Sequence, residues 1–221
     1  MSNLRADGFE TGSPALLKAR LIAAPRVLAI GASTGGPQAL SLLLGQLAPH
    51  LDNLPVIVVL HMPAEFTEVV TAHIQRATGR PTHAARSGQE IRPGEIYFAP
   101  GHCHLKVARL GATPILLHCE APPENFCRPA VNVLFRSVAQ VYGTGALAIV
   151  LTGMGTDGLD GARDLVKAGA TVIAQDQASS VVWGMPGAIA QQGLASAILP
   201  IDRMANEIAA LLHKPTAGVA A

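Results

Sequence analysis

The sequence predicts a three-layer α/β/α fold built on a doubly wound, mostly parallel sheet with a β-hairpin insertion. Short apolar runs rich in Val, Ile and Leu alternate with amphipathic helical segments along most of the chain, which is typical of such sheets. Hydrophobic residues make up 49% of the sequence, but aromatic residues make up only 4%. This aliphatic composition suits parallel strands that are buried on both faces.

The first half of the chain contains two strong strands, each followed by a helix. Arg26–Ile30 is a short apolar strand, and a glycine-rich turn leads from it into a helix opened by Pro37. Proline suits the first turn of a helix because the N–H that it lacks has no partner there. Val56–Leu60 is the second strand, and the helix after it carries an apolar stripe formed by Phe66, Val69, Val70, His73, Ile74 and Ala77.

The second half of the chain begins with a different pattern. Residues 82–119 are short alternating runs broken by Pro-Gly and Leu-Gly-Ala turns, which predicts β-hairpins. A helix is then expected over Ala130–Tyr142, with an inward face formed by Val131, Leu134, Phe135, Val138 and Val141. Further helices are expected after the TGMGTDG segment, near Pro186–Gln191 and at the end of the fold. The remaining strands are expected at Ala146–Leu151, Thr171–Gln175 and Ala197–Leu199.

Composition limits the class of protein. The 16 Lys+Arg residues nearly balance the 15 Asp+Glu residues, so no global field favours nucleic acid or an anionic membrane. The three cysteines form no CxxC pair, and no apolar run has the length of a membrane span or the features of a signal peptide. We therefore expect a soluble, cytoplasmic protein without disulfides, cofactor or metal. Residues 1–25 are expected to form a flexible leader, residues 26–213 one folded domain, and residues 214–221 a frayed tail.

The strongest local signal is the segment Gly31-Ala32-Ser33-Thr34-Gly35, which lies between a predicted strand and a predicted helix. It is a G-x-S-x-G pattern in the setting that raises a serine hydroxyl clear of the backbone, so Ser33 is the candidate nucleophile. The N–H groups at the start of the helix could stabilise an oxyanion beside that hydroxyl. The pattern alone is equally consistent with a phosphate-binding turn, although a dinucleotide fingerprint would have glycine in place of Ser33.

A nucleophilic serine needs a base and an orienting carboxylate. Active sites of open parallel sheets lie at the carboxyl ends of strands, and among eight histidines only His61 directly follows a strong buried strand. Asp157 lies just beyond the strand Ala146–Leu151, which makes it the candidate acid, although a helix N-cap is a second role open to it. Asp160 and Asp164 lie farther along the next helix, where a favourable interaction with the helix dipole is explanation enough.

Other histidines have simpler interpretations. His73 lies in the middle of a predicted helix and is expected to be a packed or surface residue. His102 and His104 flank Cys103 in the predicted hairpin region, where residues i and i+2 share a face. A metal site there is disfavoured because no further ligands follow at a recognisable spacing.

At these residues the sequence closely resembles the catalytic domain of the chemotaxis protein-glutamate methylesterase family, CheB. The resemblance runs from about Arg26 to the last helix and is carried by several separate motifs in order. Such a series is far more specific than a lone G-x-S-x-G pattern. The motifs are AIGASTGGP (Ala29–Pro37), LHMP (Leu60–Pro63), YFAPG (Tyr97–Gly101), LTGMGTDG (Leu151–Gly158) and VVWGMP (Val181–Pro186).

The resemblance implies hydrolysis of glutamate methyl esters on cytoplasmic helices of methyl-accepting chemoreceptors, with release of methanol, and deamidation of particular receptor glutamines. It assigns Ser33 as nucleophile, His61 as base and Asp157 as orienting acid. The backbone amides of Thr34 and Met154 would form the oxyanion hole. The family's three-layer α/β/α fold agrees with the periodicity, and residues 26–213 would be the methylesterase catalytic domain.

The sequence departs from the family pattern in two respects. Family members usually carry an N-terminal receiver domain, which residues 1–25 are too short to form, so the protein either acts alone or is regulated by a separate receiver protein. The family segment N-R-H-R-P-S-V-D here reads N-F-C-R-P-A-V-N, with Cys127 in place of His and Asn132 in place of Asp. Arg128 is retained and is a candidate substrate-side residue. We expect these changes to affect receptor specificity rather than the hydrolytic step.

Other classes of function predict different behaviour. A nucleotide- or phosphate-binding module on the same fold would be protected against unfolding by nucleotide, and a sulfonyl fluoride would not acylate Ser33. A catalytically silent adaptor on receptor arrays fits poorly with a complete triad. A thiol hydrolase using Cys127 or Cys103 is disfavoured because the sequence suggests no strand-end base near either thiol.

Overall fold

The computed structural model describes residues 23–212, so most of the predicted leader and all of the predicted tail lie outside the described residues. The main sheet has seven parallel strands in the order β3-β4-β2-β1-β7-β8-β9. These strands are β1 (Val27–Ala32), β2 (Val56–Leu60), β3 (Thr82–Ala84), β4 (Ile96–Phe98), β7 (Ala146–Val150), β8 (Thr171–Gln175) and β9 (Ala197–Leu199). A separate antiparallel hairpin is formed by β5 (His104–Leu110) and β6 (Thr113–Cys119).

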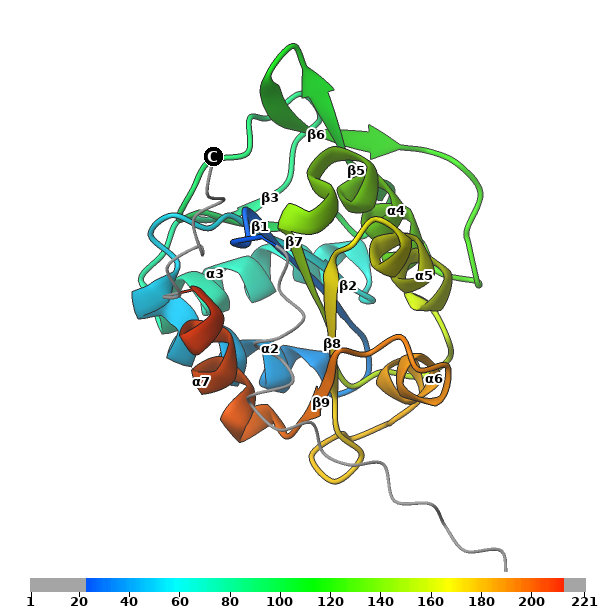
Figure 1. The fold of residues 1–221 in the computed structure, drawn as a ribbon. Coiled ribbons are helices and arrows are strands. Elements are labelled where there is room, and N and C mark those ends of the chain that lie inside the picture. The colour runs from blue at the N-terminus through cyan, green and yellow to red at the C-terminus, as the bar shows by residue number, and fades with distance from the viewer. Residues whose placement is uncertain (1–22, 213–221) are drawn as a thin grey trace, which may run out of the picture.

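Helices cover both faces of the sheet, which confirms the three-layer α/β/α prediction (Figure 1). One layer contains α2 (Gly36–Leu47), α3 (Thr67–Thr78) and α7 (Ile201–Leu212). The other contains α4 (Val131–Tyr142), α5 (Leu159–Lys167) and α6 (Met185–Gln191). Successive strand residues point to opposite layers: Leu28 and Ile30 pack with the first group of helices, whereas Val27 and Ala29 pack with the second. None of the helices within residues 23–212 is both long and apolar enough to span a membrane.

The predicted hairpins over residues 82–119 are only partly correct. β3 and β4 pair in parallel with each other and β4 pairs in parallel with β2, so both belong to the main sheet. Only β5 and β6 form a hairpin, which lies beside α4 (Figure 1). β3 and β4 are three residues long each, and runs this short carry too little periodicity to separate a sheet strand from a hairpin strand.

The apolar stripe predicted for the helix after β2 is also wrong in part. Ile74 is fully buried as expected, but Phe66 is 51% exposed and Val69 is 63% exposed. A short 3-10 turn over Ala64–Phe66 precedes the helix, which begins at Thr67. Phe66 therefore lies outside the regular helix, and the face that packs on the core includes threonines instead.

Candidate active site

The central strand β1 has β2 on one side and β7 on the other, which makes its carboxyl end the topological switch point of the sheet. Ser33 directly follows β1, His61 directly follows β2, and Asp157 lies in the segment after β7. The N–H of His61 donates a hydrogen bond to the carbonyl of Ala32 at 3.0 Å. All three predicted triad residues therefore arise from neighbouring strand ends.

The Ser33 turn is fixed by its backbone. The Ser33 N–H donates to the carbonyl of Thr152 at 3.0 Å, and the Ser33 carbonyl accepts from the N–H of Gly36 at 2.7 Å. Gly35, at the N-cap of α2, has φ 80°, a left-handed conformation that favours glycine. A Cβ at Gly153 would lie 2.8 Å from the Cβ of Ser33, so the two loops approach this closely only because Gly153 has no side chain.

Thr152 joins three of the loops that surround Ser33. Its hydroxyl donates to the carbonyl of Thr34 at 2.9 Å and accepts from the N–H of Val182 at 3.0 Å. Within residues 23–212, the N–H groups of Thr34 and Met154 donate no hydrogen bond. These two amides, the predicted oxyanion hole, are thus free to receive a negatively charged oxygen from a substrate.

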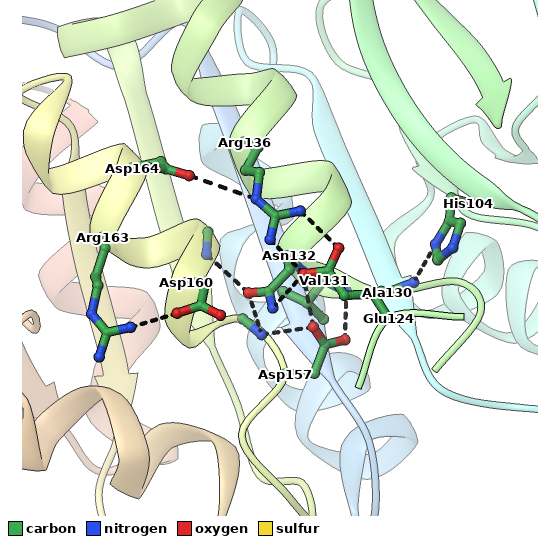
Figure 2. Close-up of polar contacts among 12 residues, drawn as sticks. His104, Glu124, Ala130, Val131, Asn132, Arg136, Asp157, Asp160, Arg163 and Asp164 are labelled. Atoms are coloured by element: carbon green, nitrogen blue, oxygen red, sulfur yellow. Dashed lines mark hydrogen bonds and ion pairs between the residues drawn. The ribbon is translucent and has the colours of Figure 1, made fainter. Parts of the chain in front are cut away.

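Asp157 is 1% exposed and is surrounded by N–H donors. Its Oδ2 atom accepts from His61 Nε2 at 2.8 Å and from the Val131 N–H at 2.6 Å. Its Oδ1 atom accepts from the N–H groups of Asn132 at 3.0 Å and Gly158 at 2.9 Å. Figure 2 shows this carboxylate beneath the first residues of α4. Asp157 therefore accepts from His61 and from the first N–H groups of α4, but it is not the N-cap of the following helix α5, which is Gly158. Its role as the orienting acid stays a prediction.

A polar network that begins at the buried Asn132 and ends at the half-buried Glu124 and Arg136 was not predicted from the sequence (Figure 2). Asn132 is fully buried, and its Oδ1 atom accepts from the N–H groups of Gly158 at 3.0 Å and Gly161 at 2.9 Å. Its Nδ2 group donates to Glu124 Oε1 at 3.0 Å. Arg136 donates to Glu124 Oε2 at 2.7 Å, and this guanidinium lowers the pKa of Glu124. The available signal was an Asn at position 132, in the first turn of the helix predicted over Ala130–Tyr142.

The two acids that we assigned to the helix dipole lie on α5 and have partners of their own. The Asp160 side chain is 56% exposed and pairs with Arg163. The Asp164 side chain is 41% exposed and lies 3.6 Å from Arg136 Nε. Exposed carboxylates with cationic partners of this kind have little influence on a buried site. Asp157 therefore remains the candidate acid.

Cys127 occupies the other side of His61. Its sulfur lies 3.7 Å from His61 Nδ1, so the expectation that no base is near this thiol is wrong. Burial raises the pKa of the Cys127 thiol to about 11, and the charge of Asp157 adds to the effect. The thiol is therefore protonated at neutral pH, and its single S–H has two acceptors within reach, the Asn125 carbonyl at 3.4 Å and His61 Nδ1 at 3.7 Å. Of the two family departures, Cys127 thus contacts His61, whereas the Asn132 side chain contacts Gly158 and Gly161 and only its backbone N–H reaches Asp157. Their expected effect on receptor specificity stays a prediction.

Ser33 and His61 are not joined by a hydrogen bond within residues 23–212. Catalytic hydrogen bonds are often long before substrate binds and tighten in the substrate complex. Because Nε2 donates to Asp157, Nδ1 is the nitrogen left to act as a base. The role of Ser33 as nucleophile therefore stays a prediction.

The other residues considered in the sequence analysis have separate positions. Arg128 is exposed and forms no hydrogen bond or ion pair with another described residue. His104 is fully buried, with Nδ1 accepting from the Ala130 N–H at 3.0 Å and Nε2 donating to the Pro122 carbonyl at 3.1 Å (Figure 2 shows the first contact). His73 is exposed and lies 3.0 Å from the Ser41 hydroxyl, in agreement with a surface role.

Comparison with known proteins gives a consistent set of relatives. Residues 28–208 match the profile of the family described as CheB methylesterase. A protein-glutamate methylesterase/protein-glutamine glutaminase of Rhodopseudomonas palustris is 50% identical over 188 residues, which is 85% of this chain and 48% of that protein. One from Rhodospirillum rubrum is 52% identical over 182 residues, covering 82% of this chain and 47% of that protein. The chain thus spans about half the length of these relatives.

A solved structure gives the same result for the fold. The CheB methylesterase catalytic domain of Thermotoga maritima matches 86% of this chain and 100% of its own length, with a TM-score of 0.82 and 33% sequence identity. The doubly wound architecture is therefore shared with that domain.

Proposed function

Because this chain belongs to the CheB methylesterase family, we propose that it is a serine hydrolase that demethylates glutamate methyl esters on chemoreceptor helices. We propose the glutaminase activity named for its relatives as a second reaction of the same site. The observation that carries the proposal is the convergence of Ser33, His61 and Asp157 beyond adjacent strand ends. An ester carbonyl brought to Ser33 would lie close to a base and to unpaired backbone amides.

In the proposed mechanism, His61 Nδ1 takes the proton of the Ser33 hydroxyl as its oxygen attacks the ester carbonyl carbon. Asp157 holds the Nε2 proton and stabilises the imidazolium that forms. The amides of Thr34 and Met154 receive the oxyanion. The tetrahedral intermediate expels the methoxy group, which takes the proton from His61 and leaves as methanol.

The second half of the reaction repeats these steps with water. His61 removes a proton from a water molecule, the water oxygen attacks the glutamyl–Ser33 ester, and Ser33 leaves as the protonated hydroxyl. The product is a glutamate side chain. For a glutamine substrate the first leaving group is ammonia, and the same acyl intermediate forms.

The surroundings of Ser33 favour a large substrate such as a receptor helix. Phe126 is 103% exposed, Met154 is 75% exposed and Val181 is 69% exposed, each on a loop that carries or adjoins a site residue. Exposed apolar side chains gathered at a functional site commonly mark an interaction surface. Arg128 adds a positive charge without a partner in the described chain, which suits a helix carrying glutamates. We propose that these residues contact the receptor.

The direct test is to incubate the protein with methylated receptor and to measure volatile methanol. Wild-type protein should release methanol, and Ser33→Ala protein should not. Binding of receptor without methanol release would favour an adaptor. Protection against unfolding by nucleotide, together with no acylation by a sulfonyl fluoride, would favour a nucleotide-binding module.

A further inference from the structure

Three potential metal ligands, none of them a triad residue, meet at the base of the β5–β6 hairpin. They are His102, Cys103 and His118, and their ligand atoms all lie within 4.8 Å of one another. The first two come from the turn before β5, and the third lies on β6, opposite Leu105 in the hairpin register. Pairing of β6 with β5 thus brings His118 to the other two ligands, although its spacing along the sequence does not indicate this.

His118 is oriented in the way that metal-binding histidines usually are. Its Nε2–H donates to the backbone carbonyl of Ala85 at 2.8 Å. That contact fixes the tautomer and leaves Nδ1 unprotonated, with its lone pair available. A second hydrogen bond, from the His118 N–H to the Ser87 hydroxyl at 3.2 Å, holds the backbone. Metal-ligating histidines almost always donate their other ring N–H to a carbonyl or carboxylate in this manner.

The other two donors are also uncommitted. Neither the Cys103 thiol nor the His102 ring forms a hydrogen bond within residues 23–212. Cys103 is 2% exposed, whereas His102 is exposed, and the His102 ring meets the His118 ring edge-on with centroids 6.2 Å apart. His104 is different, because both of its nitrogens are already hydrogen-bonded to backbone groups.

The two histidines also line a cavity of about 620 Å³. Polar side chains share its wall, among them Glu68, His83, Arg86 and Gln89. A cation held by the three ligands would therefore have an open coordination position toward this cavity. A water molecule or a small anionic group could fill that position.

We propose that His102, Cys103 and His118 bind one thiophilic divalent cation, with Zn²⁺ as the best match. Two imidazoles and one thiolate are typical zinc ligands, and three protein ligands with an open fourth position form a tetrahedral site. Zn–N distances of about 2.0 Å and Zn–S distances of about 2.3 Å require donors about 3.3–3.7 Å apart. The cluster must therefore contract slightly, which the exposed His102 turn allows. As the sulfur–metal bond forms, the Cys103 thiol releases its proton to solvent.

The second possible cluster, formed by His61, Cys127 and Asp157, is a poorer metal site. Both oxygens of Asp157 are already occupied by N–H donors, so metal binding there would break the contacts that cap α4. The hairpin cluster loses no hydrogen bond when it binds a cation. The proposed metal therefore uses no residue of the triad.

The test is a titration of the full chain with Co²⁺, which gives a thiolate-to-cobalt charge-transfer band when a cysteine binds, followed by displacement with Zn²⁺. We expect one equivalent of Co²⁺ to bind, with the band lost in Cys103→Ala. His118→Gln and His102→Gln should weaken binding by more than the roughly 10–100-fold that loss of an outer-shell partner costs. Cys119→Ala is the matched control, because Cys119 follows His118 on β6 and lies near Cys103 but is not one of the three clustered donors.

Circular dichroism and methanol release separate a lost metal site from a lost fold. His102 is exposed, so His102→Gln should fold normally even if Cys103→Ala does not. The proposal is overturned if the band survives Cys103→Ala, or if it disappears in Cys127→Ala and persists in the hairpin variants. The second result would place the metal at His61. The absence of any cobalt band in folded wild-type protein would also overturn it.

Discussion

Asp157 and Ser33 follow neighbouring strands, but their surroundings differ sharply. Asp157 is 1% exposed, and its two oxygens accept from His61 and from the backbone N–H groups of Val131, Asn132 and Gly158. Ser33 is half-buried, and the amides of Thr34 and Met154 donate to no group within residues 23–212. All the hydrogen bonds of Asp157 are therefore formed before substrate binds, whereas two backbone amides beside Ser33 are left to bind the substrate oxygen.

The hydrogen bonds to Asp157 also offset the free-energy cost of burying its charge. An ionised carboxylate in a protein interior is costly unless hydrogen bonds replace its hydration. The first N–H groups of α4 have no partners within the helix, and the N-terminal end of a helix favours negative charge. Asp157 and α4 therefore stabilise each other, and the position of His61 depends on this contact.

The largest effect is expected from the nucleophile side. Ser33→Ala should reduce methanol release by about 10⁶-fold, which is to background, and leave the fold intact, because the side chain makes no structural hydrogen bond in the described chain. His61→Ala should cause a similar loss, and the double variant should be no worse, since the triad acts as a unit. Rate measurements on the three variants check this. Substantial methanol release by Ser33→Ala would remove Ser33 from the mechanism.

Turnover should also be strongly sensitive to substitution of Asp157. Asp157→Asn should lower turnover by about 10⁴-fold at most, because an amide favours the wrong tautomer of His61. The matched control is Asp160→Asn, which removes an exposed carboxylate paired with Arg163. Its effect should be below about 1 kcal/mol in both activation and unfolding free energies. If the ranking is reversed, Asp160 rather than Asp157 supports the base.

Disrupting the polar network behind Asp157 should lower the free energy of unfolding more than it changes the reaction rate. Asn132→Ala leaves the Gly161 N–H without its acceptor and removes one of the two acceptors of the Gly158 N–H, so it should lower the unfolding free energy by about 1–3 kcal/mol. Asn53→Ala, at an exposed position, should change it by less than about 0.5 kcal/mol. Urea denaturation of both variants checks this. Equal stability of the two would show that the buried amide contributes nothing net.

Residues at the ends of strong strands could be predicted from the sequence, whereas contacts between distant loops could not. Strong β-branched strands and the residues that follow them, such as His61 after Val56–Leu60, were predicted because strand ends converge in a parallel sheet. Short strands such as β3 and β4 were misplaced because three residues carry little pattern. Contacts between distant loops had no local signal. The approach of Cys127 to His61 depends on the path of a whole loop and could not be read from spacing.

A smaller effect is expected at Cys127, which meets the one ring nitrogen available to Ser33. Cys127→Ala removes a weak S–H donor from Nδ1 and should change methanol release by less than about threefold, equivalent to roughly 0.7 kcal/mol of barrier. Cys119→Ala is the control for a general effect of thiol loss. A fall to background in Cys127→Ala alone would make Cys127 the nucleophile.

The last prediction concerns the reactivity of the Cys127 thiol rather than the rate of methanol release. Burial and the Asp157 charge raise the pKa of Cys127 to about 11, so only about one thiol in 10⁴ is ionised at pH 7. Alkylation of Cys127 by iodoacetamide, followed by mass spectrometry of the Cys127 peptide, should therefore rise about tenfold per pH unit toward that pKa. Asp157→Asn removes the nearby negative charge, lowers the pKa and should increase the alkylation rate at any fixed pH below it. Alkylation that already reaches a plateau near neutral pH would mean that Cys127 and His61 form a thiolate–imidazolium pair, and the serine mechanism would then lose its base.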